Sequence, residues 1–213
     1  MTDLRGYNNN LSPARNSGWI AARATQDGTL YRASYSLAAA IEGRLFGCHF
    51  GTLTTPVTTP ATQAITTGLP QAILRVPDGT VVIPLAVNII VESTGVTTQG
   101  EIAIGICQND VGNGTSTAGT SGPLSLNTAA PVTSNCTARQ LVTVIGTAES
   151  NLLEFKRYSF ALSAVNQEFN WYASQAEITP ILRGPATLLI YIGGNAVVFY
   201  AQAQWIELPE SAV

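Results

Sequence analysis

His49 is the residue that any acid–base or nucleophilic mechanism in this chain would have to use, because the sequence holds a single histidine. It stands between Cys48 and Phe50 in a segment that alternates like a β-strand. Neighbouring side chains on a strand point to opposite faces, so Cys48 and His49 do not form a nucleophile–base pair. The sequence also lacks a Gly-x-Ser-x-Gly nucleophile elbow. We therefore expect a protein that is not an enzyme, with His49 as an ordinary core or surface residue.

The acidic residues and glycines form no recognisable metal or nucleotide motif. The segment 109–114 (NDVGNG) has some residues of a weak calcium loop, but an ordinary turn is the favoured interpretation. Gly112 and Gly114 lack the third glycine of a dinucleotide-binding loop. The four aspartates are far apart in sequence: Asp3, Asp27, Asp78 and Asp110. We expect no metal, no cofactor and no catalytic residue.

The cysteines Cys48, Cys107 and Cys136 are an odd number without a Cys-x-x-Cys pair. This pattern favours free, buried thiols in a reducing compartment. A disulfide between Cys107 and Cys136 remains the alternative.

One group of residues permits a carbohydrate hypothesis. Glu168 lies close in sequence to Trp171 and Tyr172, and a sugar site combines aromatic rings with carboxylates. A Trp-Tyr pair after a strand is more often part of a core or an interface. Carbohydrate binding therefore stays open as an alternative, and sugar cleavage is disfavoured.

The composition gives the strongest functional signal. Charged residues make up 11% of the 213 residues, against about 25% in an average soluble protein, while the hydrophobic fraction is 46%. A net charge of −3 provides no general basic surface, so we expect no direct nucleic-acid binding. Neutral Thr, Asn and Gln lose less hydration energy than Lys or Glu when an interface covers them. We therefore expect other protein subunits, including copies of this chain, to cover much of the surface.

The apolar segments predict neither export nor membrane insertion. The first ten residues lack the apolar core of a secretory signal. The longest apolar run, 81–91, is broken by Pro84 and Asn88 and is shorter than the roughly 18 residues that span a bilayer. We expect a protein made in the host cytoplasm, without membrane contact.

Residues 1–18 predict an extended N-terminal arm, because they contain three consecutive asparagines, a proline and no helical or strand periodicity. Five of the nine arginines lie in the first 44 residues, where three acidic residues oppose them. A solvated arm is one interpretation. The other is that arginines contact carboxylates and carbonyls of a neighbouring chain. The proposed partner-binding residues are Arg5, Tyr7, Arg15 and Trp19.

Residues 19–213 predict a single all-β domain. Eight segments have strand character: 44–50, 71–76, 81–91, 101–108, 139–145, 152–163, 186–192 and 196–208. Pro84 predicts an edge position or a bulge, 77–80 predicts a turn, and 193–195 predicts a hairpin between the last two strands. The segments 35–42 and 166–176 are the two helix candidates. Eight strands in this length favour a two-sheet β-sandwich, an eight-stranded jelly roll with an extended N-terminal arm.

Three segments resemble structural proteins of tailed-bacteriophage particles: 79–85 (GTVVIPL), 183–194 (RGPATLLIYIGG) and 199–208 (FYAQAQWIEL). They are most similar to the jelly-roll capsid decoration (cement) proteins that trimerise on the outside of a capsid. The resemblance implies a viral structural protein located in the virion, a homotrimer, contacts to the major capsid protein and no cofactor. The alternatives are a major capsid protein that forms the shell itself, or a carbohydrate-binding β-sandwich of a phage tail or fibre.

Overall fold

The computed structural model describes residues 35–52, 54–59, 65–93, 100–118, 121–129, 131–160, 166–176, 179–194 and 196–212, together with the backbone of 5–7 and 19–21. One α-helix, α1 (Tyr35–Ile41), precedes the sandwich in these ranges, and two short 3-10 helices, η1 (Ala173–Gln175) and η2 (Glu210–Ala212), follow later strands. The strands are β1 (Arg5–Tyr7), β2 (Trp19–Ala21), β3 (Leu45–Phe50), β4 (Val57–Thr58), β5 (Ala72–Val76), β6 (Thr80–Ser93), β7 (Gly100–Cys107), β8 (Thr115–Ala118), β9 (Ser121–Ser125), β10 (Thr137–Val144), β11 (Leu153–Phe160), β12 (Gln167–Tyr172), β13 (Leu182–Arg183), β14 (Ala186–Gly193) and β15 (Val198–Pro209).

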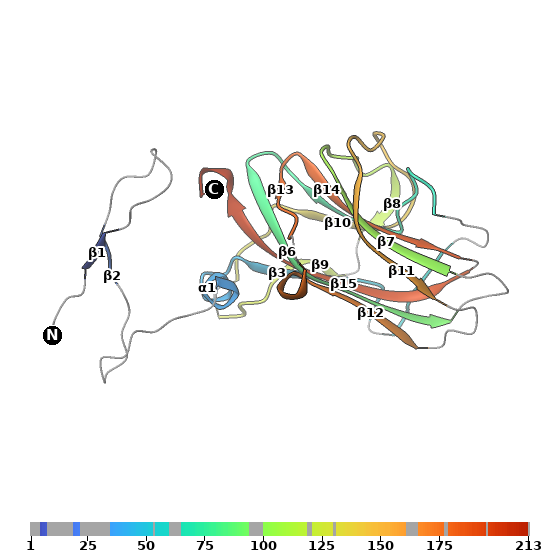
Figure 1. The fold of residues 1–213 in the computed structure, drawn as a ribbon, viewed down its shortest axis with the longest axis horizontal. Coiled ribbons are helices and arrows are strands. Elements are labelled where there is room, and N and C mark those ends of the chain that lie inside the picture. The colour runs from blue at the N-terminus through green and yellow to red at the C-terminus, as the bar shows by residue number, and fades with distance from the viewer. Residues whose placement is uncertain are drawn as a thin grey trace.

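Two antiparallel sheets pack face to face as a β-sandwich, as predicted (Figure 1). One sheet has the order β12-β6-β15-β3-β9, and the other has the order β11-β7-β14-β5-β10-β8. The strands β3, β5, β6, β7, β11, β12, β14 and β15 can be numbered 1 to 8 along the chain. The sheets then contain 1-8-3-6 and 2-7-4-5, which is the strand arrangement of an eight-stranded jelly roll.

The core lies between the sheets because the inward positions of each strand are apolar. In β3, Phe46, Cys48 and Phe50 are buried while His49 is exposed, as the alternation predicts. Phe46 stacks on Trp205 of β15, with 6.3 Å between the ring centroids. The long strands β6 and β15 pair over most of their length and form the centre of their sheet.

Pro84 lies at a bulge, as predicted. The pairing of β6 with β15 shifts register between Ala86 and Pro84. On the other side of β6, β12 pairs as far as Ala86 and β13 pairs with Val81 and Val82, so neither strand pairs with Pro84. Since proline has no backbone N–H to donate, this local gap accommodates it.

Two sequence predictions about local structure are wrong. The segment 166–176 is not a helix: it contains β12, which pairs along β6, and the single turn η1. Strand geometry buries Trp171 between the sheets while Glu168 faces solvent. The hairpin expected at 193–195 is also absent, because β14 pairs with β5 and β7 in one sheet and β15 with β3, β4 and β6 in the other. The helix prediction for 35–42 is confirmed by α1.

The long connection between β7 and β10 adds β8 and β9 to the two sheets. Glu207 anchors the end of this connection that leads into β10. Its buried carboxylate accepts hydrogen bonds from the Asn135 backbone N–H at 3.0 Å, from the Ser134 hydroxyl and from the indole N–H of Trp205 at 2.9 Å. Three donors satisfy a charge that would otherwise be costly to bury.

The three cysteines are free and buried, which confirms the prediction of free, buried thiols. Burial raises the pKa of the Cys48 thiol to about 12. Burial likewise raises the pKa values of Cys107 and Cys136, the latter with a smaller contribution from the charge of Glu207.

Candidate interaction surface

The outer face of the sheet β12-β6-β15-β3 is the candidate site, and we call it the outer sheet face. Every second residue of each strand points away from the core. Its outward positions are occupied by Glu168, Asn170 and Tyr172 of β12, Ala86, Asn88, Ile90 and Glu92 of β6, Tyr200, Gln202 and Gln204 of β15, and Gly47 and His49 of β3.

A row of neutral polar side chains crosses this face. Strand register places Asn170 opposite Asn88, Asn88 opposite Gln202, and Gln202 opposite His49. The side-chain oxygens Oδ1 of Asn88 and of Asn170 are buried and have no hydrogen-bond partner. The Asn170 amide nitrogen donates to Glu168 Oε1 at 2.9 Å. An unpartnered buried acceptor costs about 1–3 kcal/mol, so each of the two oxygens lowers the stability of the isolated chain.

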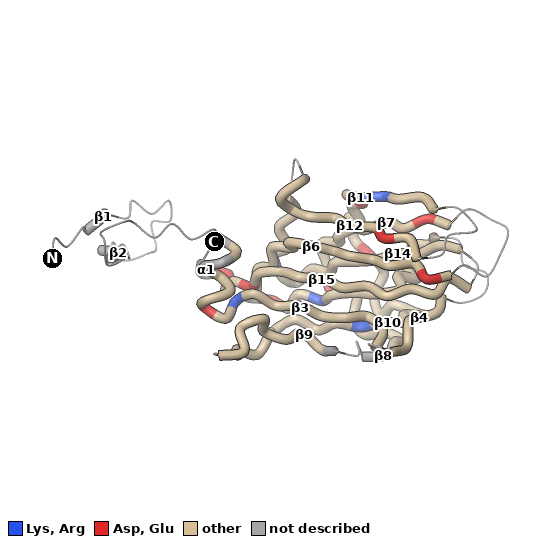
Figure 2. Tube along the Cα trace, turned by 90° about the horizontal axis from the view of Figure 1, so that it is seen from below, with Lys and Arg blue, Asp and Glu red and all other residues tan. Residues whose placement is uncertain are grey.

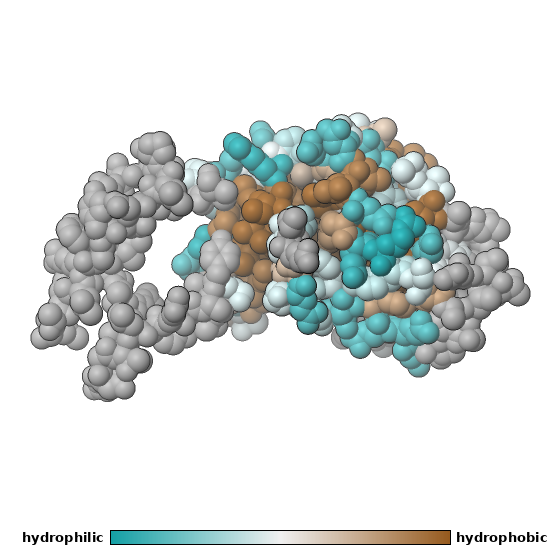
Figure 3. Space-filling model, viewed as in Figure 1, coloured by the Kyte–Doolittle hydropathy of each residue, from teal (hydrophilic) through white to brown (hydrophobic). Residues whose placement is uncertain are grey.

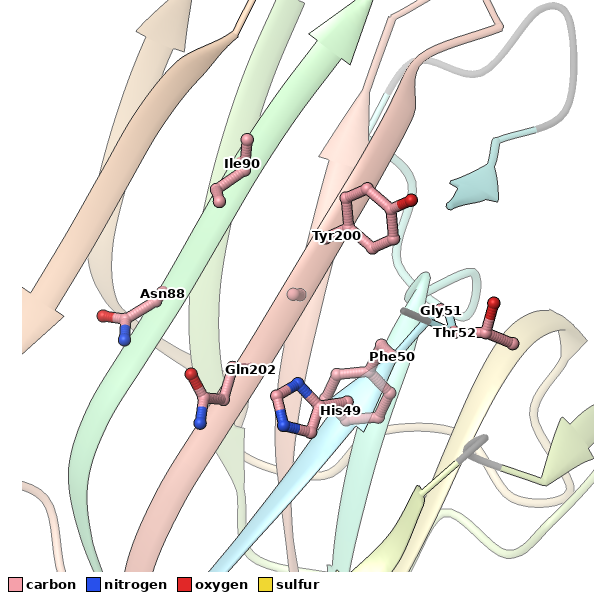
Figure 4. A pocket seen from close by; sticks show the side chains of 9 residues that line it. His49, Phe50, Gly51, Thr52, Asn88, Ile90, Tyr200 and Gln202 are labelled. Carbon is pink, nitrogen blue, oxygen red and sulfur yellow. The ribbon is translucent and has the colours of Figure 1, made fainter. Parts of the chain in front are cut away.

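A hollow of about 300 Å³ lies beside this row, and we call it the sheet hollow. Figure 4 shows Asn88 and Ile90 on β6, Tyr200 and Gln202 on β15, and His49 on β3 around it. Ile90 is 41% exposed and supplies an apolar wall. Desolvation, with a smaller contribution from the Glu92 carboxylate, raises the pKa of the Tyr200 phenol. The hollow thus combines neutral hydrogen-bonding groups with apolar and aromatic surface.

The outer sheet face carries no positive charge from its own strands. The strands β3, β6, β12 and β15 contain neither lysine nor arginine, and much of their length is tan in Figure 2. Two carboxylates face outward, Glu92 and Glu168, while Glu207 of β15 is buried. The face is therefore weakly acidic, and it attracts a cationic partner more readily than an anionic one.

One end of the outer sheet face is apolar and lies beneath α1. Ala39 of α1 is buried in a cluster with Val81, Ile206 and Leu208. Nearby on β9 and the residue that follows it, Leu124 is 60% and Leu126 is 46% exposed. Figure 3 shows a hydrophobic area near β13 at this end of the sandwich, whereas hydrophilic side chains lie over β11. Exposed apolar groups of this kind mark interaction surfaces.

Cys48 and His49 do not form a nucleophile–base pair in the structure. His49 is exposed on the outer face while Cys48 is buried on the inner one, so the two side chains point apart. Within the described ranges, no group of three or more His, Cys, Asp or Glu side chains is placed to hold a metal ion. Asp110 closes a turn instead, accepting from the Gly112 backbone N–H at 2.9 Å and pairing with Arg75. No helix in the described part of the chain is long and apolar enough to cross a membrane.

The aromatic residues considered for carbohydrate binding are partly withdrawn from solvent. Trp171 is 5% exposed and packs edge-on against Phe155, with 5.0 Å between the ring centroids. A second hollow, of about 600 Å³, lies between β11 and β12 and is lined by Trp171, Tyr172 and Lys156, among others. A sugar would stack on an exposed ring face, which Trp171 does not present.

The partner-binding residues predicted from the sequence lie in or beside the N-terminal segment. β1 and β2 pair antiparallel, with Arg5 opposite Ala21 and Tyr7 opposite Trp19. Arg15 and most of the predicted arm 1–18 lie outside the described residues. No motif in the sequence marks Asn88, Asn170 or Gln202 as a site residue. The alternation of 198–205 gave a partial signal, since it placed Gln202 and Gln204 on one face.

Comparison of the chain with protein-family models, with curated proteins and with solved structures finds no match.

Proposed function

We propose that this protein is a structural protein of a virus particle, a capsid decoration (cement) protein that clamps neighbouring capsid subunits. Its partners would be the major capsid protein and copies of itself in a homotrimer. The observation that carries the proposal is the outer sheet face, a broad surface without lysine or arginine on which two buried amide oxygens lack donors. Such a surface gains stability when another protein covers it.

The jelly-roll strand order adds support, because viral capsid proteins and lectins use this architecture. Fold alone does not assign a function, so the side chains must decide between such uses. The buried ring of Trp171 disfavours sugar stacking, and the position of His49 outside the core disfavours chemistry inside the sandwich. An assembly role uses the features that remain, namely the weakly acidic outer sheet face and the arginines of residues 1–34.

The mechanism is mechanical. Burying complementary surface raises the free energy needed to separate subunits, and several weak contacts on one particle act together. The arm 1–18, through Arg5, Tyr7 and Arg15, together with the adjacent Trp19, would hold a neighbouring subunit. Deleting residues 1–18 should then reduce occupancy on purified particles, and undiminished occupancy would refute the clamp.

Expression of the chain alone distinguishes the decoration role from a shell-forming role. A decoration protein should give discrete trimers in negative-stain electron micrographs and by native mass spectrometry. Closed shells would show instead that the chain is a major capsid protein. A chain that is monomeric and does not bind to capsids would contradict both roles.

A further inference from the structure

We propose that the sheet hollow is the receptor for the N-terminal segment, residues 1–34, of a neighbouring copy of this chain. The inference rests on the proposed function as an assembly protein and identifies where one copy holds the next. The side chains that would form the contact on the receiving copy are His49, Asn88, Tyr200 and Gln202.

The hydrogen-bonding groups of the hollow and of the segment match. Of the two unpartnered side-chain oxygens on the outer sheet face, that of Asn88 belongs to a residue that lines the hollow. Residues 1–34 are rich in side-chain donors, with four arginines and one tryptophan besides the asparagines: Arg5, Arg15, Arg23, Arg32, Trp19, Asn8, Asn9, Asn10 and Asn16. Arginine carries five N–H donors and no acceptor, so it can donate to Asn88 without creating a new unsatisfied acceptor.

The charges of residues 1–34 and of the outer sheet face also favour this contact. Residues 1–34 hold four arginines against Asp3 and Asp27, whereas the chain as a whole has a net charge of −3. The outer sheet face presents Glu92 and Glu168 and no cation from its own strands. The cationic segment and the weakly acidic face are therefore complementary, which favours their encounter and fixes their orientation.

The place where residues 1–34 join the sandwich also favours this contact. Residue 35 begins α1, and Ala39 of α1 packs on the outer sheet face against Val81, Ile206 and Leu208. The N-terminal segment thus joins the sandwich at the same face that contains the sheet hollow. The 13 residues 22–34, which connect β2 to α1, span up to about 45 Å when extended, which allows the β1–β2 pair to reach an adjacent copy.

Within this segment, β1 and β2 pair with each other. An isolated two-stranded hairpin is at best marginally stable in water, so this pair needs a surface on which to pack. Register places Tyr7 opposite Trp19, and Tyr200 and Ile90 give the hollow an apolar lining.

Photo-crosslinking in the full-length protein tests the inference. Tyr200 is replaced by p-benzoylphenylalanine, copies with light and heavy isotopes are mixed and assembled, and the crosslinked peptides are sequenced by mass spectrometry. We expect crosslinks that join position 200 of one isotope to a peptide within residues 1–34 of the other. Crosslinks confined to a single copy would overturn the inference, because the segment would then fold back on its own sheet.

The same experiment separates the two proposals. Assembled protein without crosslinks to residues 1–34 would overturn the receptor assignment and leave the assembly role intact. Protein that remains monomeric at every concentration and on capsids would overturn both.

Substitutions provide a second measurement, made in proteins that all carry p-benzoylphenylalanine at position 200. Asn88→Leu and Gln202→Leu should lower the yield of intermolecular crosslinks by about tenfold, because a few central residues carry most of an interface's affinity. The matched control is Ser159→Leu, an exposed position on β11 of the other sheet, which should leave the yield within about twofold. Equal yields in all three variants would contradict the assignment.

Discussion

Asn88 of β6 and Asn170 of β12 are register partners, and each buries a side-chain oxygen that no donor reaches. Two such oxygens on one sheet face are unusual, since buried polar groups in folded proteins are nearly always paired. The pair costs stability in the isolated chain, and a partner that supplied donors to it would recover this cost.

Asn88→Leu should therefore stabilise the isolated chain. Removing the unpartnered acceptor while keeping a similar volume should raise the free energy of unfolding by about 1 kcal/mol. Urea denaturation in dilute solution measures this change. The control is Asn127→Leu, because the Asn127 amide donates to the Ile41 carbonyl and accepts from the Ala129 N–H, both at 3.0 Å. The control substitution should lower the free energy of unfolding. An equal loss in both variants would contradict the claim that the Asn88 oxygen lacks a donor.

Glu207→Gln should destabilise the end of the connection that precedes β10. The amide group can accept from fewer of the three donors that surround the carboxylate, which should cost about 1–3 kcal/mol. Urea denaturation and faster hydrogen exchange at Asn135 would record the loss. Glu210→Gln is the control, because its partner Arg183 is 71% exposed and such pairs contribute under about 1 kcal/mol.

The ion pair between Arg75 and Asp110 should give the stability an acid-sensitive component. The hydrogen bond from Arg75, rather than burial, lowers the pKa of Asp110 below its ordinary value of 3.8. Because the folded pKa is depressed, the contribution is complete above the unfolded pKa and is lost as pH falls through the folded value. Asp110→Asn should thus destabilise at pH 7, and the difference from the wild type should shrink below about pH 4.

Denaturation at a series of pH values measures that difference. Asp78→Asn, at an exposed turn position, should differ little from the wild type at any pH. If the difference in free energy of unfolding between Asp110→Asn and the wild type stays constant down to about pH 2, this would contradict the assigned role of the ion pair.

The three thiols should resist alkylation in the folded protein. With a pKa of about 12, Cys48 is roughly one part in ten thousand thiolate at pH 8, and the buried Cys107 and Cys136 also have raised pKa values. Iodoacetamide should label none of the three in the native state and all three in urea, as counted by intact mass. Rapid native labelling, or two thiols missing after unfolding, would contradict the free and buried assignment.

The sequence predicted the sandwich because its strands alternate and its turns are explicit. Phe46, Cys48 and Phe50 share one face as expected, and the turn 77–80 closes with the Thr80 N–H donating to the Pro77 carbonyl at 3.3 Å. The turn also uses Gly79 at a φ of 75°, a conformation that favours glycine. These features depend on local residues alone.

The remaining features depend on contacts between distant parts of the chain. Whether 167–172 is a strand or a helix is decided by pairing with β6, which lies about 80 residues earlier. The same pairing sets Asn170 beside Asn88, so no local pattern could reveal the two unpartnered oxygens. Likewise, β14 and β15 follow one another in sequence, yet each finds its hydrogen-bond partners in a different sheet.

Sedimentation velocity of the full-length chain over a range of concentrations tests most directly whether other copies cover its neutral surface. Our account predicts a discrete oligomer, a trimer, at about 10 μM, which dissociates when Asn88 and Gln202 are both replaced by leucine. A single monomeric species up to about 100 μM, unchanged by those substitutions, would contradict it.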